Sequence, residues 1–342
     1  MRRSWSVPSL FFLSALAGGS LRSPAVRAEC AAEPCFRRGD ANVDGFVDVS
    51  DALYILNFLF RGGDPLPCPE AAETNSTEKL EITDSVFLLN YLYLGGSAPA
   101  APFPDCGPAP AGCAYPRSLC EGAPLRREDP TLHLAFDAPL VIEGPASGKV
   151  EALAMVTLDN AFIDAPRVEG WNLSVRAEPL EVLAVKAAST EDAVARGFTT
   201  RLTTEPGNEG VINTAILQFG LALPLSVDQP PHRLLDLTLE AAVPPSGCVK
   251  GRLLFRNGLT LFGVPHDNFV ISRGRRFNPF SRPLDISVCA HLPELFLGEA
   301  REFTLSPTSP QALFKLRPPG SAPLVLQLDD ADEADANALY LG

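Results

Sequence analysis

The feature that most constrains the fold is an internal repeat of 33 residues near the N-terminal end. The apolar stretch ALYILNFLF (residues 52–60) recurs as SVFLLNYLY (residues 85–93), and Asn57 corresponds to Asn90. A cysteine precedes each copy, acidic residues lie directly in front of each apolar stretch, and Gly-Gly follows it. A single loop–helix unit of this size cannot bury its apolar helix alone. The repeat therefore predicts two loop–helix copies that pack together within residues 29–107.

The acidic stretch GDANVDGFVDVSD (residues 39–51) has the spacing of a twelve-residue calcium loop of the EF-hand type. Such a loop takes oxygen ligands from positions 1, 3, 5, 9 and 12 and a backbone carbonyl from position 7, and it needs glycine at position 6. Gly45 stands at position 6. Several carboxylates this close repel one another unless a cation lies among them. We therefore expect the following residues to bind Ca²⁺: Asp40, Asn42, Asp44, Phe46 (through its carbonyl), Asp48 and Asp51.

The second copy of the loop departs from this pattern. Glu78 replaces the glycine at position 6, and Thr77 supplies no charge at position 5. A residue with a side chain costs about 1 kcal/mol in the left-handed conformation that position 6 requires. We expect calcium binding to be weak or lost at its five side-chain positions, which are Glu73, Asn75, Thr77, Glu81 and Asp84.

Residues 1–28 have the features of a secretory signal peptide. Arg2 and Arg3 precede a short apolar run, and Val26 and Ala28 are small residues in front of the expected cleavage site. Eight cysteines without a CxxC pair favour disulfide bonds in an oxidising compartment. The net charge of −13 disfavours nucleic acids and anionic membranes as partners. No later stretch approaches the roughly 20 apolar residues of a membrane span. We expect a secreted protein.

Residues 108–130 are rich in Pro, Ala, Gly and Cys, and we expect a stiff linker there. Short period-two runs separated by turn residues then predict a β-sandwich over residues 131–295. Residues 296–342 contain four more strand-like runs, too few for a stable core, which suggests an incomplete β module. Two disulfides are expected, Cys248–Cys289 and Cys68–Cys106, whereas the pairing of Cys30, Cys35, Cys113 and Cys120 stays open.

Two stretches resemble known families. The two loops, each followed by one helix, resemble type I dockerin repeats, in the variant of secreted planctomycete-type proteins that has a cysteine before each loop and Gly-Gly after each helix. The segments VTLDN (156–160) and GWNLSVRAEPLEVLAVKA (170–187) resemble a cohesin-type jelly-roll sandwich. The tail resembles the start of a pre-peptidase C-terminal sandwich. The fold class implied is multidomain: a small α-helical dockerin-like domain, a mainly-β sandwich and a partial β tail.

The resemblance implies a protein partner, namely a cohesin-like domain, which could belong to another copy of the chain. No catalytic motif is evident, and the carboxylates Glu191, Asp192 and Glu205 are not singled out as a glycosidase pair. Trp171 is expected in the core, so carbohydrate binding is not expected. We predict a secreted, non-catalytic, calcium-binding protein for extracellular assembly or adhesion, connected with polysaccharide breakdown. The alternative is a fragment or accessory part of a secreted glycoside hydrolase.

Overall fold

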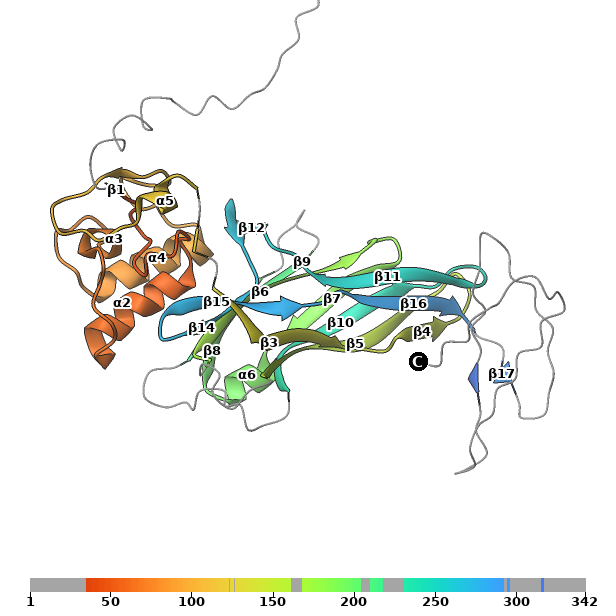
Figure 1. Ribbon diagram of the computed structural model, residues 1–342. Coiled ribbons are helices and arrows are strands. Elements are labelled where there is room, and N and C mark those ends of the chain that lie inside the picture. Colours follow the sequence, from red (N-terminus) through yellow and green to blue (C-terminus); the bar gives the residue numbers. More distant parts are fainter. Residues whose placement is uncertain are drawn as a thin grey trace, which may run out of the picture. The chain divides into compact units, whose positions relative to one another are not determined.

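The computed structural model describes residues 35–122, 124–125, 127–160, 168–203, 210–217, 231–291, 294–295 and 315–316. The predicted signal peptide, Cys30, Glu205 and nearly all of the predicted β tail lie outside these residues. The chain forms two compact units (Figure 1). The main boundary between them in the sequence lies at residues 126–127, and Arg273–Arg275 also belong to the first unit. Each unit is described by itself below.

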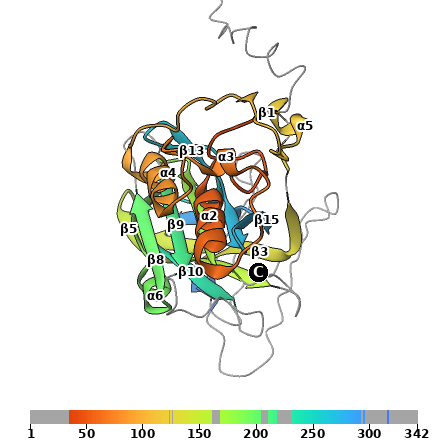
Figure 2. The ribbon, with the colours of Figure 1, turned by 90° about the vertical axis from the view of Figure 1, so that its left-hand side faces the viewer.

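Two helices of equal length form the centre of the first unit. Helix α2 (Val49–Arg61) and helix α4 (Ile82–Leu94) start 33 residues apart and lie side by side (Figures 1 and 2). Both end at a glycine in the left-handed conformation, Gly62 and Gly95, as the repeated Gly-Gly predicts. The Ser85 hydroxyl in α4 donates to the Ala52 carbonyl in α2 at 3.1 Å. The loop–helix repeat predicted from the sequence is therefore present in the structure.

Four short elements surround these helices. Helix α3 (Pro69–Ala72) precedes the second loop, and helix α5 (Arg117–Cys120) lies close to strand β1. Strand β1 (Cys35–Phe36) pairs antiparallel with strand β2 (Gly107–Pro108). Residues 107–122 thus belong to the first unit, so the expected linker over residues 108–130 is wrong for most of its length. The proline-rich sequence prevents long regular elements there, but short pairing and disulfides hold the segment in place.

The disulfides of the first unit differ from the predicted pair. Cys68 bonds Cys113 and Cys106 bonds Cys120, so the predicted Cys68–Cys106 bond is wrong. The reason is that the segment after Cys106 folds back, which brings Cys113 rather than Cys106 to Cys68. Cys35 is buried. Three disulfides in the described chain fit an oxidising compartment.

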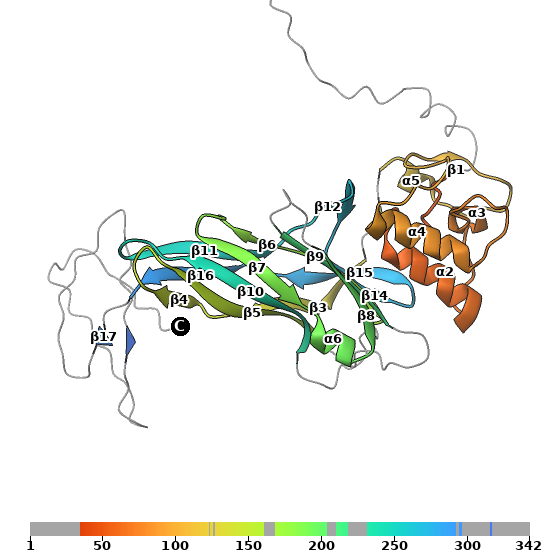
Figure 3. The same cartoon turned by 180° about the vertical axis from the view of Figure 1, so that it is seen from behind.

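The second unit is mainly β, as expected, and consists of two layers (Figures 1 and 3). One layer has the strand order β15-β3-β5-β10-β7, with bounds Arg275–Ser281, Glu128–Asp137, Lys149–Asn160, His232–Ala242 and Leu183–Ser189. The other has the order β4-β16-β11-β6-β9-β8, with bounds Val141–Gly144, Leu284–Ala290, Cys248–Phe255, Gly170–Glu178, Gly210–Leu217 and Phe198–Thr203. Strand β14 (Phe269–Ser272) pairs with β6 and leads into β15, which links the layers.

Smaller elements complete the second unit. Helix α6 (Glu191–Ala195) precedes β8, and β12 (Leu259–Leu261) forms a hairpin with β13 (Val264–His266). Strand β17 (Glu294–Leu295) pairs parallel with β18 (Lys315–Leu316), the one described part of the predicted tail.

One hydrophobic core lies between the two layers. Alternation along β10 points Leu235, Leu237 and Leu239 into this core, where each is at most 1% exposed. Trp171 in β6 is also 1% exposed and packs on Phe198, so its predicted core position is confirmed. The burial of these apolar side chains is the main source of stability for the unit.

A disulfide and a polar layer add to this core. Cys248 in β11 and Cys289 in β16 are directly opposite cross-strand partners, and the structure contains the predicted disulfide between them.

On the face of β6 opposite to Trp171, Ser174 is fully buried. It donates its hydroxyl to the His266 carbonyl at 2.9 Å and its N–H to Asn268 Oδ1 at 2.7 Å. Strand β6 is therefore covered on both faces.

Candidate calcium site

The first acidic loop leads directly into helix α2. Asp48 is the N-cap of the helix, and its Oδ1 accepts from the Ser50 N–H at 2.8 Å. In return, Asp51 Oδ2 accepts from the Asp48 N–H at 2.9 Å, which completes a capping box. Gly45 has φ +89° at the bend of the loop, as position 6 requires. The carboxylates of Asp48 and Asp51 therefore stabilise both the end of the loop and the first turn of the helix.

Most side-chain oxygens of this loop are buried. Asp40 and Asp51 have no exposed surface, and Asn42 and Asp44 are only 2% and 4% exposed. Asp40 accepts from the N–H groups of Asp44 at 3.0 Å and Gly45 at 2.9 Å. Asp51 Oδ1 accepts from the Asn42 N–H at 3.1 Å. The loop therefore contains a cluster of side-chain oxygen atoms that is buried away from water.

The electrostatics of these carboxylates are unfavourable in the absence of a cation. Burial raises the pKa of Asp40 to about 6, although hydrogen bonds from Tyr115 and the loop N–H groups act in the opposite direction. Burial also raises the pKa of Asp51 well above its usual value, and the charges of Asp40, Asp44 and Asp48 raise it further. Four carboxylates in this setting favour either bound protons or a bound cation.

One oxygen of the loop lacks any hydrogen-bond partner. Asn42, at position 3, donates its Nδ2 to Ser50 Oγ at 2.8 Å, whereas its buried Oδ1 accepts no hydrogen bond. A buried carbonyl oxygen without a partner costs free energy, and a cation would satisfy it. The donor set of this loop consists only of oxygen, which suits Ca²⁺ better than zinc or copper. The residues present therefore fit a calcium ion.

No three carboxylates of this loop, which the structure describes throughout, have oxygens that all lie within 4.8 Å of one another. Among the His, Cys, Asp and Glu side chains of the described residues, the one group of three that does so is Cys68, Glu70 and Cys113. Two of these are joined in a disulfide, so that group does not offer thiolates to a metal. Several carboxylate oxygens of the first loop accept hydrogen bonds from loop N–H groups.

The second loop keeps the same backbone path with different chemistry. Glu73 at position 1 accepts from the Thr77 and Glu78 N–H groups through Oε1, whereas its Oε2 forms an ion pair with Arg38 Nη1 at 2.9 Å. Glu78 has φ +62° at position 6, the conformation expected to be strained there. Asp84 is fully buried and accepts from the Thr74 N–H at 2.8 Å.

The remaining predicted ligands of the second loop are more open to solvent. Thr77 and Glu81 are exposed, and Asn75 is half-buried. In the second loop, the guanidinium of Arg38 therefore supplies the positive charge. This loop, all of whose residues are described, has no buried cluster of carboxylates like that of the first loop.

Two residues at these loops escaped prediction from the sequence. Arg38 lies two residues before the first loop, yet its guanidinium reaches the second loop and also donates to the Glu70 carbonyl at 3.3 Å. Tyr115 lies in the expected linker, and its hydroxyl donates to Asp40 Oδ2. Arg38 has no counterpart in the second copy, where Ala71 stands at its position, and Tyr115 lies after the repeat, so spacing gave no signal for either residue. The available signal was the cysteine pattern, because cysteines on both sides of Tyr115 indicate that this segment is held by disulfide bonds.

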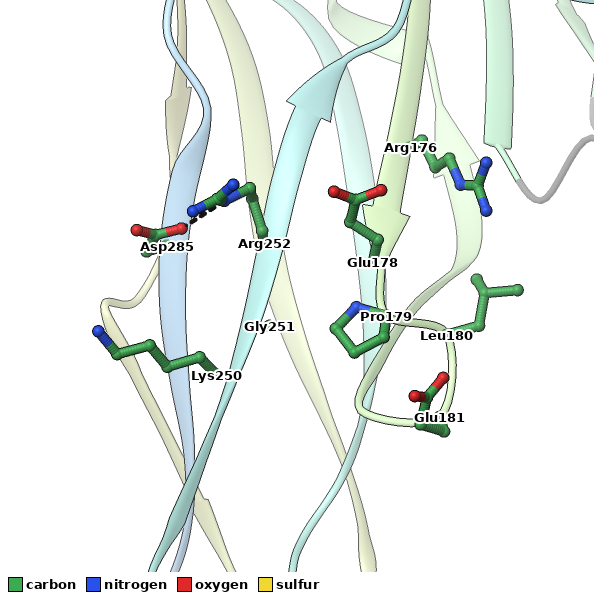
Figure 4. A pocket seen from close by; sticks show the side chains of 9 residues that line it. All are labelled: Arg176, Glu178, Pro179, Leu180, Glu181, Lys250, Gly251, Arg252 and Asp285. Atoms are coloured by element: carbon green, nitrogen blue, oxygen red, sulfur yellow. Dashed lines mark hydrogen bonds and ion pairs between the residues drawn. The ribbon is translucent and has the colours of Figure 1, made fainter. Parts of the chain in front are cut away.

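The second unit has an open surface pocket of about 540 Å³ over β6, β11 and β16 (Figure 4). Its charged side chains balance, with three cations and three anions, and Arg252 pairs with Asp285 at 2.6 Å. The residues lining it are Arg176, Glu178, Pro179, Leu180, Glu181, Lys250, Gly251, Arg252 and Asp285. This balance does not select a strongly charged ligand.

Asp192 was considered above as one carboxylate of a glycosidase pair. It lies in α6 and forms an ion pair with Arg196, the residue that follows this helix.

No helix in the described part of the chain has both the length and the apolar character needed to cross a membrane.

Comparisons with known proteins give matches only among solved structures. No protein-family profile matches the sequence, and no curated protein matches it. One similar structure is a chain of a type I cohesin–dockerin complex from Clostridium thermocellum, at 10% identity and a TM-score of 0.35, covering 49% of this chain and 100% of that one. Another is the cohesin module of a family 33 glycoside hydrolase from Clostridium perfringens, at 8% identity and a TM-score of 0.34, covering 48% and 100%.

A third similar structure is a type II cohesin domain from the cellulosome of Acetivibrio cellulolyticus, at 9% identity and a TM-score of 0.33, covering 46% of this chain and 95% of that one. These matches, which include cohesin modules, span about half of the chain. The strand pairing given above is what establishes the β-sandwich.

Proposed function

We propose that this chain is a secreted, non-catalytic protein for extracellular assembly or adhesion, whose first unit binds one Ca²⁺ in the loop from Asp40 to Asp51. The observation that supports this most strongly is the buried Asn42 Oδ1, which has no hydrogen-bond partner amid buried carboxylates. A cation in the loop would satisfy this oxygen and neutralise the carboxylates around it.

A bound calcium ion would contribute stability that the small apolar core of the first unit does not provide. Its two main helices are only 13 residues long, and a pair this short buries little apolar surface. When bound, the ion offsets the mutual repulsion of the loop carboxylates. Asp48 and Asp51 then tie the loop to the first turn of α2, so the loop and the helix are stabilised together.

We propose that the second loop does not bind calcium under ordinary conditions. The guanidinium of Arg38 already provides positive charge at Glu73, the ligand of position 1. Thr77 and Glu81 are exposed, so ligands there would have to be drawn in from solvent. The expected stoichiometry is therefore one ion per chain.

The proposed partner is a cohesin-like domain, including that of another copy of this chain. This part of the proposal rests on the sequence resemblance of the two loops to dockerins and of residues 156–187 to cohesins. Secretion is supported by the signal-peptide features of residues 1–28 and by the three disulfides.

Calorimetric titration of the chelator-treated full chain with Ca²⁺ tests the calcium proposal. We expect one site, abolished by Asp44→Ala at position 5 of the first loop. Thr77→Ala, at position 5 of the second loop, is the matched control and should leave the titration unchanged. Absence of binding, or a titration that Asp44→Ala does not alter, would overturn the proposal. Two equivalent sites would overturn the assignment of the second loop.

A further inference from the structure

We infer that the segment that begins at Cys106 stabilises the conformation of the first calcium loop, and that Tyr115 positions the ligand Asp40. We call this segment the strap and define it as residues 106–122 and 124–125. The inference rests on the proposed calcium site and adds a dependence: calcium affinity should fall when the strap is released from its disulfides.

The strap touches the loop at positions 1, 5 and 6. The Tyr115 hydroxyl donates to Asp40 Oδ2 at position 1. The Leu125 N–H donates to the Asp44 carbonyl at position 5, at 2.7 Å. At position 6, a Cβ added to Gly45 would lie 2.8 Å from Pro124 Cα, so the strap backbone packs directly against the bend. These contacts fix the half of the loop that supplies its first ligands.

The strap itself is held firmly on the first unit. The Cys106–Cys120 bond closes it into a loop of its own, and the Cys68–Cys113 bond joins it to the segment before α3. The Ala114 N–H also donates to the Pro67 carbonyl at 2.8 Å. The strap therefore cannot leave the calcium loop without breaking disulfides or large parts of the unit.

Apolar contacts connect the loop and the strap as well. Val43, at position 4 of the loop, is buried in one cluster with Phe36, Tyr115 and Leu119. The four cysteines of the two disulfides belong to this cluster or pack against it. Release of the strap would expose this side of the loop to water.

The consequence for calcium follows from preorganisation. An unbraced loop loses conformational freedom when it closes around an ion, and that loss weakens binding. Here the strap fixes much of the loop beforehand, so less freedom remains to be lost. Tyr115 occupies one oxygen of Asp40 and thereby orients the carboxylate, whereas the corresponding Glu73 of the second loop is held by Arg38.

The test measures calcium affinity of the full chain with its disulfides intact and in three variants. Tyr115→Phe should weaken binding by about tenfold, because a hydrogen bond to a charged acceptor is lost. The double variant Cys106→Ser with Cys120→Ser should weaken it by roughly tenfold or more. The matched control is Cys248→Ser with Cys289→Ser, which removes a disulfide from the second unit and should leave calcium affinity unchanged.

A spectroscopic readout separates positioning from general stability. Calcium binding changes the charge next to the Tyr115 phenol, so a calcium-induced change in tyrosine absorption is expected and should disappear in Tyr115→Phe. If the unaltered chain binds no calcium, the proposed function fails first. If it binds one ion and both Tyr115→Phe and the Cys106/Cys120 variant keep the same affinity, the inference about the strap is wrong. Should the cysteine variant not fold, Tyr115→Phe decides alone.

Discussion

At the scale of single residues, the two copies of the loop show how one backbone path supports two kinds of electrostatics. Position 1 is occupied by Asp40 in one copy and Glu73 in the other, and both accept from N–H groups four and five residues later. Their remaining partners differ: Asp40 receives a neutral phenol, whereas Glu73 receives the charge of Arg38. The first loop therefore keeps an unbalanced negative charge, and the second loop does not.

Asn42→Ala should weaken calcium binding by more than its effect on folding explains. In chelator we expect a loss of stability of about 1 kcal/mol from the hydrogen bond of Asn42 Nδ2 to Ser50 Oγ, whereas removal of Oδ1 adds nothing because that oxygen has no hydrogen bond to lose. Calcium affinity should fall by about tenfold or more, since a ligand oxygen is missing. Asn75→Ala, at the same position of the second loop, serves as the control and should not alter affinity. Equal effects of the two substitutions in calorimetric titration would contradict the assignment.

The raised pKa of Asp40 predicts an unusual dependence of stability on pH in chelator. Its pKa is about 6 in the folded chain, against 3.8 for the ordinary group. A folded-state pKa above the unfolded value contributes stability below pH 4, and this contribution is lost as the pH rises through about 6. The shift corresponds to roughly 3 kcal/mol. The calcium-free chain should therefore lose stability between pH 4 and pH 7 relative to Asp40→Asn, which cannot titrate at this position.

Denaturant unfolding of both proteins in chelator, across this pH range, measures the difference. Calcium should reverse the trend, because the ion competes with protons for the same carboxylates and binds more tightly as the pH rises. A wild-type chain that gains stability relative to Asp40→Asn between pH 4 and pH 7 in chelator would refute the burial of an ionisable Asp40.

At the scale of elements, the sequence predicted those parts that depend on local pattern. The 33-residue repeat located both helices and their glycine ends. Period-two runs located the β-sandwich as a whole, whose first strand begins at Glu128, close to the predicted start at residue 131. The fold of the strap depends on which cysteines meet in space. Spacing alone does not determine such pairing.

Position 6 of the two loops permits a reciprocal test of backbone strain. Glu78 and Gly45 both have positive φ, but only Glu78 has a side chain to strain it. Glu78→Gly should stabilise the chain by about 0.5–1 kcal/mol, because relief of strain exceeds the added freedom of the unfolded chain. Gly45→Ala should destabilise it by at least about 1 kcal/mol, since its Cβ would also meet Pro124.

Denaturant unfolding in chelator checks both changes. The calcium stoichiometry of Glu78→Gly should stay at one, because Thr77 and Arg38 are unchanged in that variant. A new calcium site in Glu78→Gly would show that the glycine alone had been limiting, contrary to the role assigned to Arg38.

At the scale of the whole molecule, the two units are stabilised by different means. The first unit has short helices, two disulfides and a cluster of buried oxygens, whereas the second has a large apolar core between two layers. Calcium should therefore raise the unfolding temperature of the first unit by mass action and leave that of the second unaffected. The disulfide of the second unit permits the converse experiment.

Removal of that disulfide by Cys248→Ala with Cys289→Ala should destabilise the second unit by up to about 4 kcal/mol. The bond closes a loop of 41 residues, and the unfolded chain regains the corresponding freedom. Differential scanning calorimetry with and without calcium should show two changes: the transition of the second unit moves to lower temperature, while the calcium-dependent shift of the first unit is kept. If the variant also lost that shift, the two units would be energetically coupled, and the calcium loop could not be treated as a property of the first unit alone.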